Sequence, residues 1–119
     1  MLNNATCFSN IYIVCGHTDL RFGIDRLVAT LTANGIDNPM AEDILYLFCG
    51  RRTDRIKGLV WEGDGYLLLY KRLEAGSFQW PRNVNDVKKL TNQQFRWLME
   101  GLTIQPQKVV KRVKPEYMA

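Results

Sequence analysis

The apolar residues of this chain fall into short runs separated by turn residues, with one stretch near the N-terminus that follows a helical period. Ile11–Cys15 is a β-branched and aromatic run that ends at Gly16, which predicts a strand. Over the next stretch, apolar side chains recur on one helical face, namely Leu20, Ile24, Leu27, Val28 and Leu31. We expect a helix over Thr18–Asn34, with Thr18 as its N-cap and Gly35 at its end.

The middle of the chain alternates apolar runs with Gly- and Asp-rich turns. The runs are Ile44–Cys49, Arg55–Trp61 and Tyr66–Leu73, and they are joined by 50–54 and 62–65. Runs this short, joined by such turns, predict an antiparallel meander. Phe78–Trp80 precedes Pro81 and is expected to add an edge strand.

A second helix is predicted near the C-terminal end of the patterned region. The polar stretch Arg82–Leu90 is expected to be a loop. Thr91 and Gln94 form a capping-box pair, and an apolar stripe follows at Phe95, Leu98, Met99 and Leu102. The sequence thus predicts an α+β fold: an antiparallel meander of four to five strands, with the helices Thr18–Asn34 and Thr91–Leu102 packed mostly on one face.

Length and charge indicate one domain followed by a tail. The 119 residues suit a single domain, which we place at 1–104 with an irregular segment at 1–10. Lys and Arg exceed Asp and Glu by 12 to 11 in 1–104, but by 4 to 1 in 105–119. We expect 105–119 to be a basic flexible tail, which could contact a DNA backbone or simply be solvated. The domain itself is nearly neutral.

The meander nevertheless concentrates cations and aromatic rings. If 62–65 is a tight turn, Trp61 faces Tyr66 and Arg55 faces Arg72. The resulting face carries cations beside aromatic rings, an arrangement that can hold phosphates and stack bases. Such rings can equally be covered by Lys and Arg stems or by a helix, so both interpretations stay open. The candidate nucleic-acid-binding residues are Arg51, Arg52, Arg55, Lys57, Trp61, Tyr70, Lys71 and Arg72.

Other chemistry has little support. Cys7, Cys15 and Cys49 have no CxxC spacing, and with a single histidine, His17, they do not form a usual zinc site. They are expected to be reduced thiols of a cytoplasmic protein. No phosphate-binding glycine loop, signal peptide or membrane-spanning run is present, so we expect no cofactor, no metal and no membrane contact. The carboxylates beside the turns, Asp54, Glu62 and Asp64, are the candidates for a metal-dependent nuclease.

Two strings of the meander are specific enough to suggest a family. Residues 50–57 read GRRTDRIK, and residues 70–81 read YKRLEAGSFQWP. Together with Cys15-Gly16, Thr18-Asp19-Leu20-Arg21 and Leu90-Thr91, they resemble the TnpB-type accessory protein, the second open reading frame, of insertion sequence (IS) family 66. The resemblance covers roughly Ile11 to Ile104 and leaves the tail outside it.

The resemblance implies a non-catalytic accessory role in the transposition of a bacterial insertion sequence, beside a separate transposase. We expect the chain to bind DNA, at the element ends, through the basic hairpin. The alternative is an adaptor that binds the transposase or another element-encoded protein, with Trp61, Tyr66 and Trp80 as anchors. A small nuclease is the least favoured hypothesis. The sequence does not determine the oligomeric state.

Overall fold

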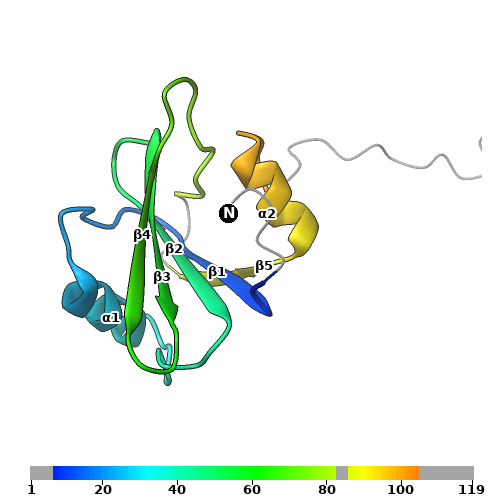
Figure 1. Ribbon diagram of the computed structural model, residues 1–119. Coiled ribbons are helices and arrows are strands. Elements are labelled where there is room, and N and C mark those ends of the chain that lie inside the picture. Colours follow the sequence, from blue (N-terminus) through cyan, green and yellow to red (C-terminus); the bar gives the residue numbers. More distant parts are fainter. Residues whose placement is uncertain (1–6, 83–85, 105–119) are drawn as a thin grey trace, which may run out of the picture.

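The computed structural model describes residues 7–82 and 86–104. The predicted basic tail at 105–119 and most of the N-terminal segment at 1–10 lie outside the described residues. The elements follow in the order β1 (Asn10–Val14), α1 (Ile24–Ala33), β2 (Ile44–Cys49), β3 (Arg55–Trp61), β4 (Tyr66–Arg72), β5 (Val87–Leu90) and α2 (Asn92–Met99). The strands form one sheet in the order β4-β3-β2-β1-β5 (Figure 1). The α+β class is therefore confirmed.

The predicted meander is present as β2, β3 and β4, and its hairpin register is confirmed. Trp61 pairs with Tyr66, Lys57 with Tyr70, and Arg55 with Arg72. The tight turn is possible because Gly63 adopts a φ of +91°, a conformation that other residues rarely take. The β3–β4 hairpin thus carries the basic residues in the relative positions that the sequence predicted.

The sheet is not antiparallel throughout, which corrects the predicted architecture. β1 runs parallel to β2, with Ile11 opposite Leu45 and Ile13 opposite Leu47. A parallel pair needs a long crossover, and residues 15–43 with α1 provide it. The N-terminal half is therefore a βαβ unit, to which the antiparallel strands β3, β4 and β5 are added.

The fifth strand lies elsewhere than predicted. Phe78–Trp80 forms no strand; Phe78 N donates to Thr53 O (2.7 Å), and the Trp80 indole N–H donates to Val14 O (3.0 Å). Both side chains are buried, so this segment packs across the sheet rather than along its edge. The edge strand is instead β5, in a stretch that we expected to be a loop. The sequence pattern did not predict β5 because its two central residues, Lys88 and Lys89, are charged. Charged residues, lysine above all, are common in strands at the edge of a sheet.

The two helices lie on opposite faces of the sheet, not mostly on one (Figure 1). Leu27 and Leu31 of α1 belong to a core with Tyr46, Phe48 and Leu59. On the other face, Phe95 and Leu98 of α2 pack with a second group that includes Ile11, Ile13, Leu45, Leu47 and Ile56. Alternate residues of each strand point to opposite faces, so β1 and β2, which are apolar or aromatic at every position after Asn10, supply both cores. This three-layer arrangement explains why the central strands are buried on both sides.

Both helices are shorter than predicted. α1 begins at Ile24 with Gly23 as its N-cap, not at Thr18, because Thr18 N donates instead to Cys49 O (2.9 Å) at the end of β2. The Thr91–Gln94 capping box of α2 is confirmed, but the helix ends at Met99. Neither helix in the described residues is long and apolar enough to span a membrane.

Candidate functional site

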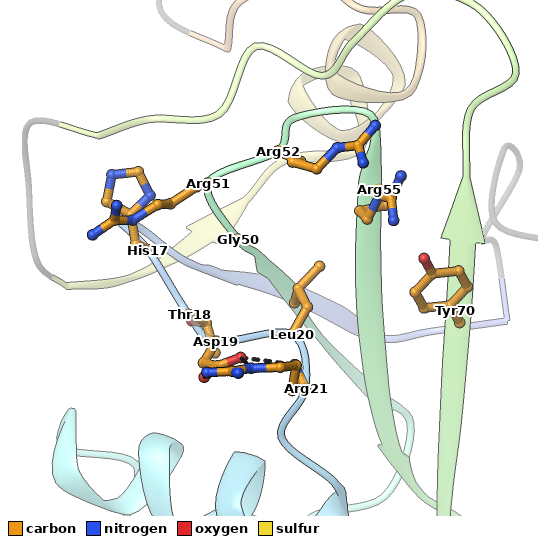
Figure 2. A pocket seen from close by; sticks show the side chains of 10 residues that line it. All are labelled: His17, Thr18, Asp19, Leu20, Arg21, Gly50, Arg51, Arg52, Arg55 and Tyr70. Carbon is orange, nitrogen blue, oxygen red and sulfur yellow. Dashed lines mark hydrogen bonds and ion pairs between the residues drawn. The ribbon is translucent and has the colours of Figure 1, made fainter.

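An open hollow of about 690 Å³ lies where the β1–α1 loop meets the β2–β3 turn. We call it the arginine hollow (Figure 2), and its lining residues are His17, Thr18, Asp19, Leu20, Arg21, Gly50, Arg51, Arg52, Arg55 and Tyr70. Four arginines thus surround the space against a single lining carboxylate. Its volume lies in the range of about 300–1,000 Å³ that is typical of ligand pockets.

The floor of the hollow is a close contact between two loops. Thr18 N donates to Cys49 O (2.9 Å), and Gly50 lies directly against Thr18 and Leu20. A Cβ at position 50 would come within 3.2 Å of Thr18 O and 3.3 Å of the Leu20 Cγ. Glycine therefore lets the Arg51–Arg52 turn approach the Thr18–Arg21 loop, and the two loops together hold the arginines around one space.

The Arg82 side chain links the same two loops through hydrogen bonds. Its guanidinium donates to Gly16 O (2.5 Å) and to Gly50 O, and one nitrogen lies 3.7 Å from the Cys49 Sγ. A planar guanidinium can reach two carbonyls at once, which an ammonium cannot do in the same geometry. Arg82 therefore holds the ends of β1 and β2 together and positions the turn that carries Arg51 and Arg52.

Two carboxylates pair with part of the positive charge. Asp54 lies 3.0 Å from the Arg55 Nε and 3.3 Å from an Arg52 nitrogen, and the hydrogen bond from Arg55 lowers the pKa of Asp54. Hydrogen bonds from Arg21 lower the pKa of Asp19 to about 2. Both carboxylates are thus ionised at neutral pH. Arg51 is exposed and has no ion pair or hydrogen bond within the described residues.

Four of the eight candidate residues come together in the hollow: Arg51, Arg52, Arg55 and Tyr70. The Tyr70 side chain is 54% exposed, which is high for a tyrosine in a sheet. Figure 2 shows it on β4 beside Arg55 of β3, with Arg52 on the adjoining turn. The sequence therefore identified one half of the hollow, the half that is built from the meander.

The other candidates lie elsewhere. The Lys57 Nζ donates to Phe22 O (3.0 Å) and so supports the loop before α1. Trp61 is at the far end of β3, packed edge-on against Tyr66 with ring centroids 4.9 Å apart. Arg72 pairs with Glu74 (3.2 Å) and does not line the hollow. Lys71 points to the opposite face, because its neighbours Tyr70 and Arg72 point to this one.

The cation–aromatic face is therefore divided rather than wholly open or wholly covered. Its Trp61 end packs into the α1 core through Tyr66 and Leu68, whereas its Arg55 end opens into the arginine hollow. On β2, the neighbours of Leu59 and Lys57 on this face are aromatic residues and not leucines. Tyr46 pairs with Leu59 and Phe48 with Lys57. These larger rings help to fill the space beneath α1.

The candidate nuclease carboxylates do not converge. Asp54 precedes β3, and Glu62 and Asp64 follow it, so a strand of seven residues, roughly 20 Å long, separates them. Asp54 is moreover engaged by two arginines. The described residues contain no group of three or more metal-ligating side chains.

Sequence reasoning missed the other half of the hollow. Asp19 and Arg21 come from the segment that we expected to be the first turn of a helix, His17 directly precedes that segment, and Arg82 comes from an expected loop. A signal was present: a strand, a helix and a strand in succession predict a parallel pair. That pairing brings the C-terminal ends of β1 and β2 to the same end of the sheet, which is where ligand sites of such units form.

The fold and the hollow define a small α+β domain whose arginines gather at one end of the sheet. The comparisons place it more closely: the chain belongs to the IS66 Orf2 like protein family, whose model matches residues 9–109. The family assignment gives the chain an accessory role in IS66 transposition, and the family is not one of known enzymes.

Two relatives come from Sinorhizobium fredii (strain NBRC 101917 / NGR234). The uncharacterized protein y4jC is 32% identical over 104 residues, which cover 86% of this chain and 88% of that protein. The uncharacterized protein y4hO is 30% identical over 92 residues, which cover 77% of this chain and 79% of that protein. No solved structure matches the chain.

Proposed function

We propose that this chain is a non-catalytic accessory protein of transposition that binds nucleic-acid phosphates in the arginine hollow. The observation that carries the proposal is the gathering of four arginines around a single open space, where two carboxylates, Asp19 and Asp54, pair with three of them and leave Arg51 unpaired among the described residues. The two carboxylates leave a net positive charge at the hollow, and phosphate oxygens are the acceptors that guanidinium groups match best. In an element-encoded accessory protein, the phosphates available are those of DNA.

The individual arginines suit different parts of this task. Arg51 is exposed and unpaired in the described structure, so it can bind a phosphate without first losing a partner. Arg52 and Arg55 share Asp54, which holds their guanidinium groups in place but neutralises part of their charge. The Arg52 side chain is 71% exposed and that of Arg55 only 24%, so Arg51 and Arg52 should contribute most of the affinity, while Arg55 helps to position the phosphate.

Tyr70 adds a surface on which a base can stack. An exposed ring beside phosphate-binding arginines is the combination found in proteins that bind single strands, where each stacked base contributes about 1–3 kcal/mol. A duplex end or an unpaired terminal stretch would satisfy both the arginines and the ring. The element ends remain the expected DNA.

The adaptor hypothesis has less support. Of its three anchors, Trp80 is buried and its indole N–H is already bonded to Val14 O. Tyr66 packs partly into the α1 core. Trp61 and Tyr66 are both partly exposed, but their rings pack edge-on against each other, with centroids 4.9 Å apart.

The test is a binding titration with labelled DNA from the element ends at low salt, as duplex and as single strands. The Arg51→Ala/Arg52→Ala double variant should weaken binding at least tenfold, since two phosphate contacts are lost. The matched control is Lys89→Ala/Arg96→Ala, which also removes two exposed positive charges but lies outside the hollow. Equal losses in the two double variants, or no binding by the wild type, would contradict the proposal.

A further inference from the structure

The outer side of β4 is an unpaired strand edge. β4 ends the sheet, and all seven of its residues pair on the other side with β3. Edge strands are normally shortened, charged, bulged or interrupted by proline, because their free backbone groups pair with any strand that approaches. β4 is long, carries no proline and has three consecutive leucines, Leu67 to Leu69, all half-buried.

The β3–β4 register shows which backbone groups face outward. Glu62 N donates to Gly65 O (2.9 Å), and Leu73 N donates to Asp54 O (2.6 Å). Because hydrogen-bonded and non-hydrogen-bonded pairs alternate in an antiparallel ladder, the odd-numbered residues of β4 bond to β3. The even-numbered residues direct their N–H and C=O groups away from the sheet, and these residues are Tyr66, Leu68, Tyr70 and Arg72.

The other edge of the sheet is different. β5 has only four residues, and it carries Lys88 and Lys89 at its centre. A short, lysine-bearing strand is a common protection against pairing. Among the described strands, β4 alone thus combines length, apolar character and a free side.

We propose that β4 pairs antiparallel with β4 of a second copy of this chain, with Leu68 on the two-fold axis. Only the even-numbered residues of β4 have outward-directed backbone groups, so they must pair with even-numbered residues of the other copy. The possible registers therefore differ by two residues. With Leu68 facing its own copy, Tyr66 faces Tyr70 and the Asp64 turn faces Arg72. This register places opposite charges at both ends of the ladder and aromatic pairs between them.

Charge selects this register over the one centred on Leu69. Moving the axis to Leu69 would set Asp64 opposite Glu74 of the other copy, which places like charges together. A second copy is the occupant that the edge fits best, because one end of the β4 hairpin is acidic, with Glu62 and Asp64, and the other is basic, with Lys71 and Arg72. Antiparallel pairing of identical strands brings these unlike ends together.

The dimer would place two arginine hollows on the same face of one continuous sheet. Residues that lie opposite each other in a ladder point to the same side, and Tyr70 lines the hollow. Two symmetry-related hollows suit a nucleic-acid target with two-fold symmetry. The pairing itself rests on β4 alone, so it can hold or fail independently of nucleic-acid binding.

The test is sedimentation velocity of the full chain over a range of concentrations, without DNA. The wild type should sediment as a dimer. Asp64→Arg and Arg72→Asp should each raise the dimer Kd roughly tenfold, since each places like charges at both ends of the ladder. The double swap Asp64→Arg/Arg72→Asp should restore the affinity. Both side chains are exposed, so these variants should fold.

A cross-linking experiment tests the register separately. In a Cys7→Ser background, which removes the exposed native thiol, Leu68→Cys should cross-link to its own copy through a short bis-maleimide. Leu69→Cys is the matched control and should cross-link poorly. A wild type that stays monomeric, a double swap that does not rescue, or preferential cross-linking at position 69 would overturn the proposal.

Discussion

Replacing Arg82 should destabilise the protein more than replacing any arginine of the hollow. The Arg82 guanidinium donates to Gly16 O and Gly50 O and is only partly exposed. Hydrogen bonds to a charged group contribute about 1.5–3 kcal/mol each. Water would partly replace the lost donor, so we expect Arg82→Ala to lower the free energy of unfolding by about 3 kcal/mol. Arg82→Lys should recover part of this loss, because one ammonium cannot bridge both carbonyls in the same way.

Equilibrium unfolding in urea measures this effect. With a slope of about 1.5 kcal/mol per molar urea, a loss of 3 kcal/mol lowers the midpoint by about 2 M. The control is Arg21→Ala, since Arg21 is 91% exposed and pairs only with Asp19; exposed pairs contribute about 0.2–1 kcal/mol. If Arg82→Ala and Arg21→Ala shift the midpoint equally, Arg82 does not fasten the two loops.

Three further outcomes follow from local contacts. Thr91→Ala removes the capping box and should cost about 1 kcal/mol in urea unfolding, whereas Thr91→Ser should cost little. Burial raises the pKa of the Cys49 thiol, so a thiol reagent at pH 8 should modify exposed Cys7 rapidly and Cys49 only on unfolding; rapid labelling of both would contradict the described packing. The hydrogen bond from Arg55 lowers the pKa of Asp54, so its contribution to stability is complete above about pH 4 and is lost as the pH falls through the lower folded value. The stability of Asp54→Asn should therefore depend less on pH below 4 than that of the wild type.

The fold was predictable where local signals decide it. The glycine-rich turn between Trp61 and Tyr66 determines the hairpin register, and the Thr91–Gln94 pair determines the start of α2. Where long-range contacts decide, local patterns were misleading. Thr18 has the chemistry of an N-cap, but its backbone is engaged by Cys49 of β2.

The same distinction explains which parts of the site were found. The Arg51–Arg52 turn is contiguous in sequence, so its charge is visible without a structure. Arg82 is isolated in a polar stretch, and its role depends on two carbonyls that lie 66 and 32 residues away. Lys57 looks equivalent to Arg55 in the alternating pattern of β3, but Lys57 donates to Phe22 O in the loop before α1, whereas Arg55 pairs with Asp54. Such differences arise from packing, which a periodic pattern does not contain.

The central claim is that the arginine hollow binds the phosphates of nucleic acid, and the salt dependence of binding tests it most directly. On duplex DNA, log K should fall with log salt concentration by about 0.9 for each phosphate neutralised, or about 0.7 on single strands. The slope for Arg51→Ala/Arg52→Ala should therefore be shallower than that of the wild type by about 1.8 on a duplex, while Lys89→Ala/Arg96→Ala keeps the wild-type slope. Identical slopes for the wild type and the Arg51/Arg52 variant would contradict the claim.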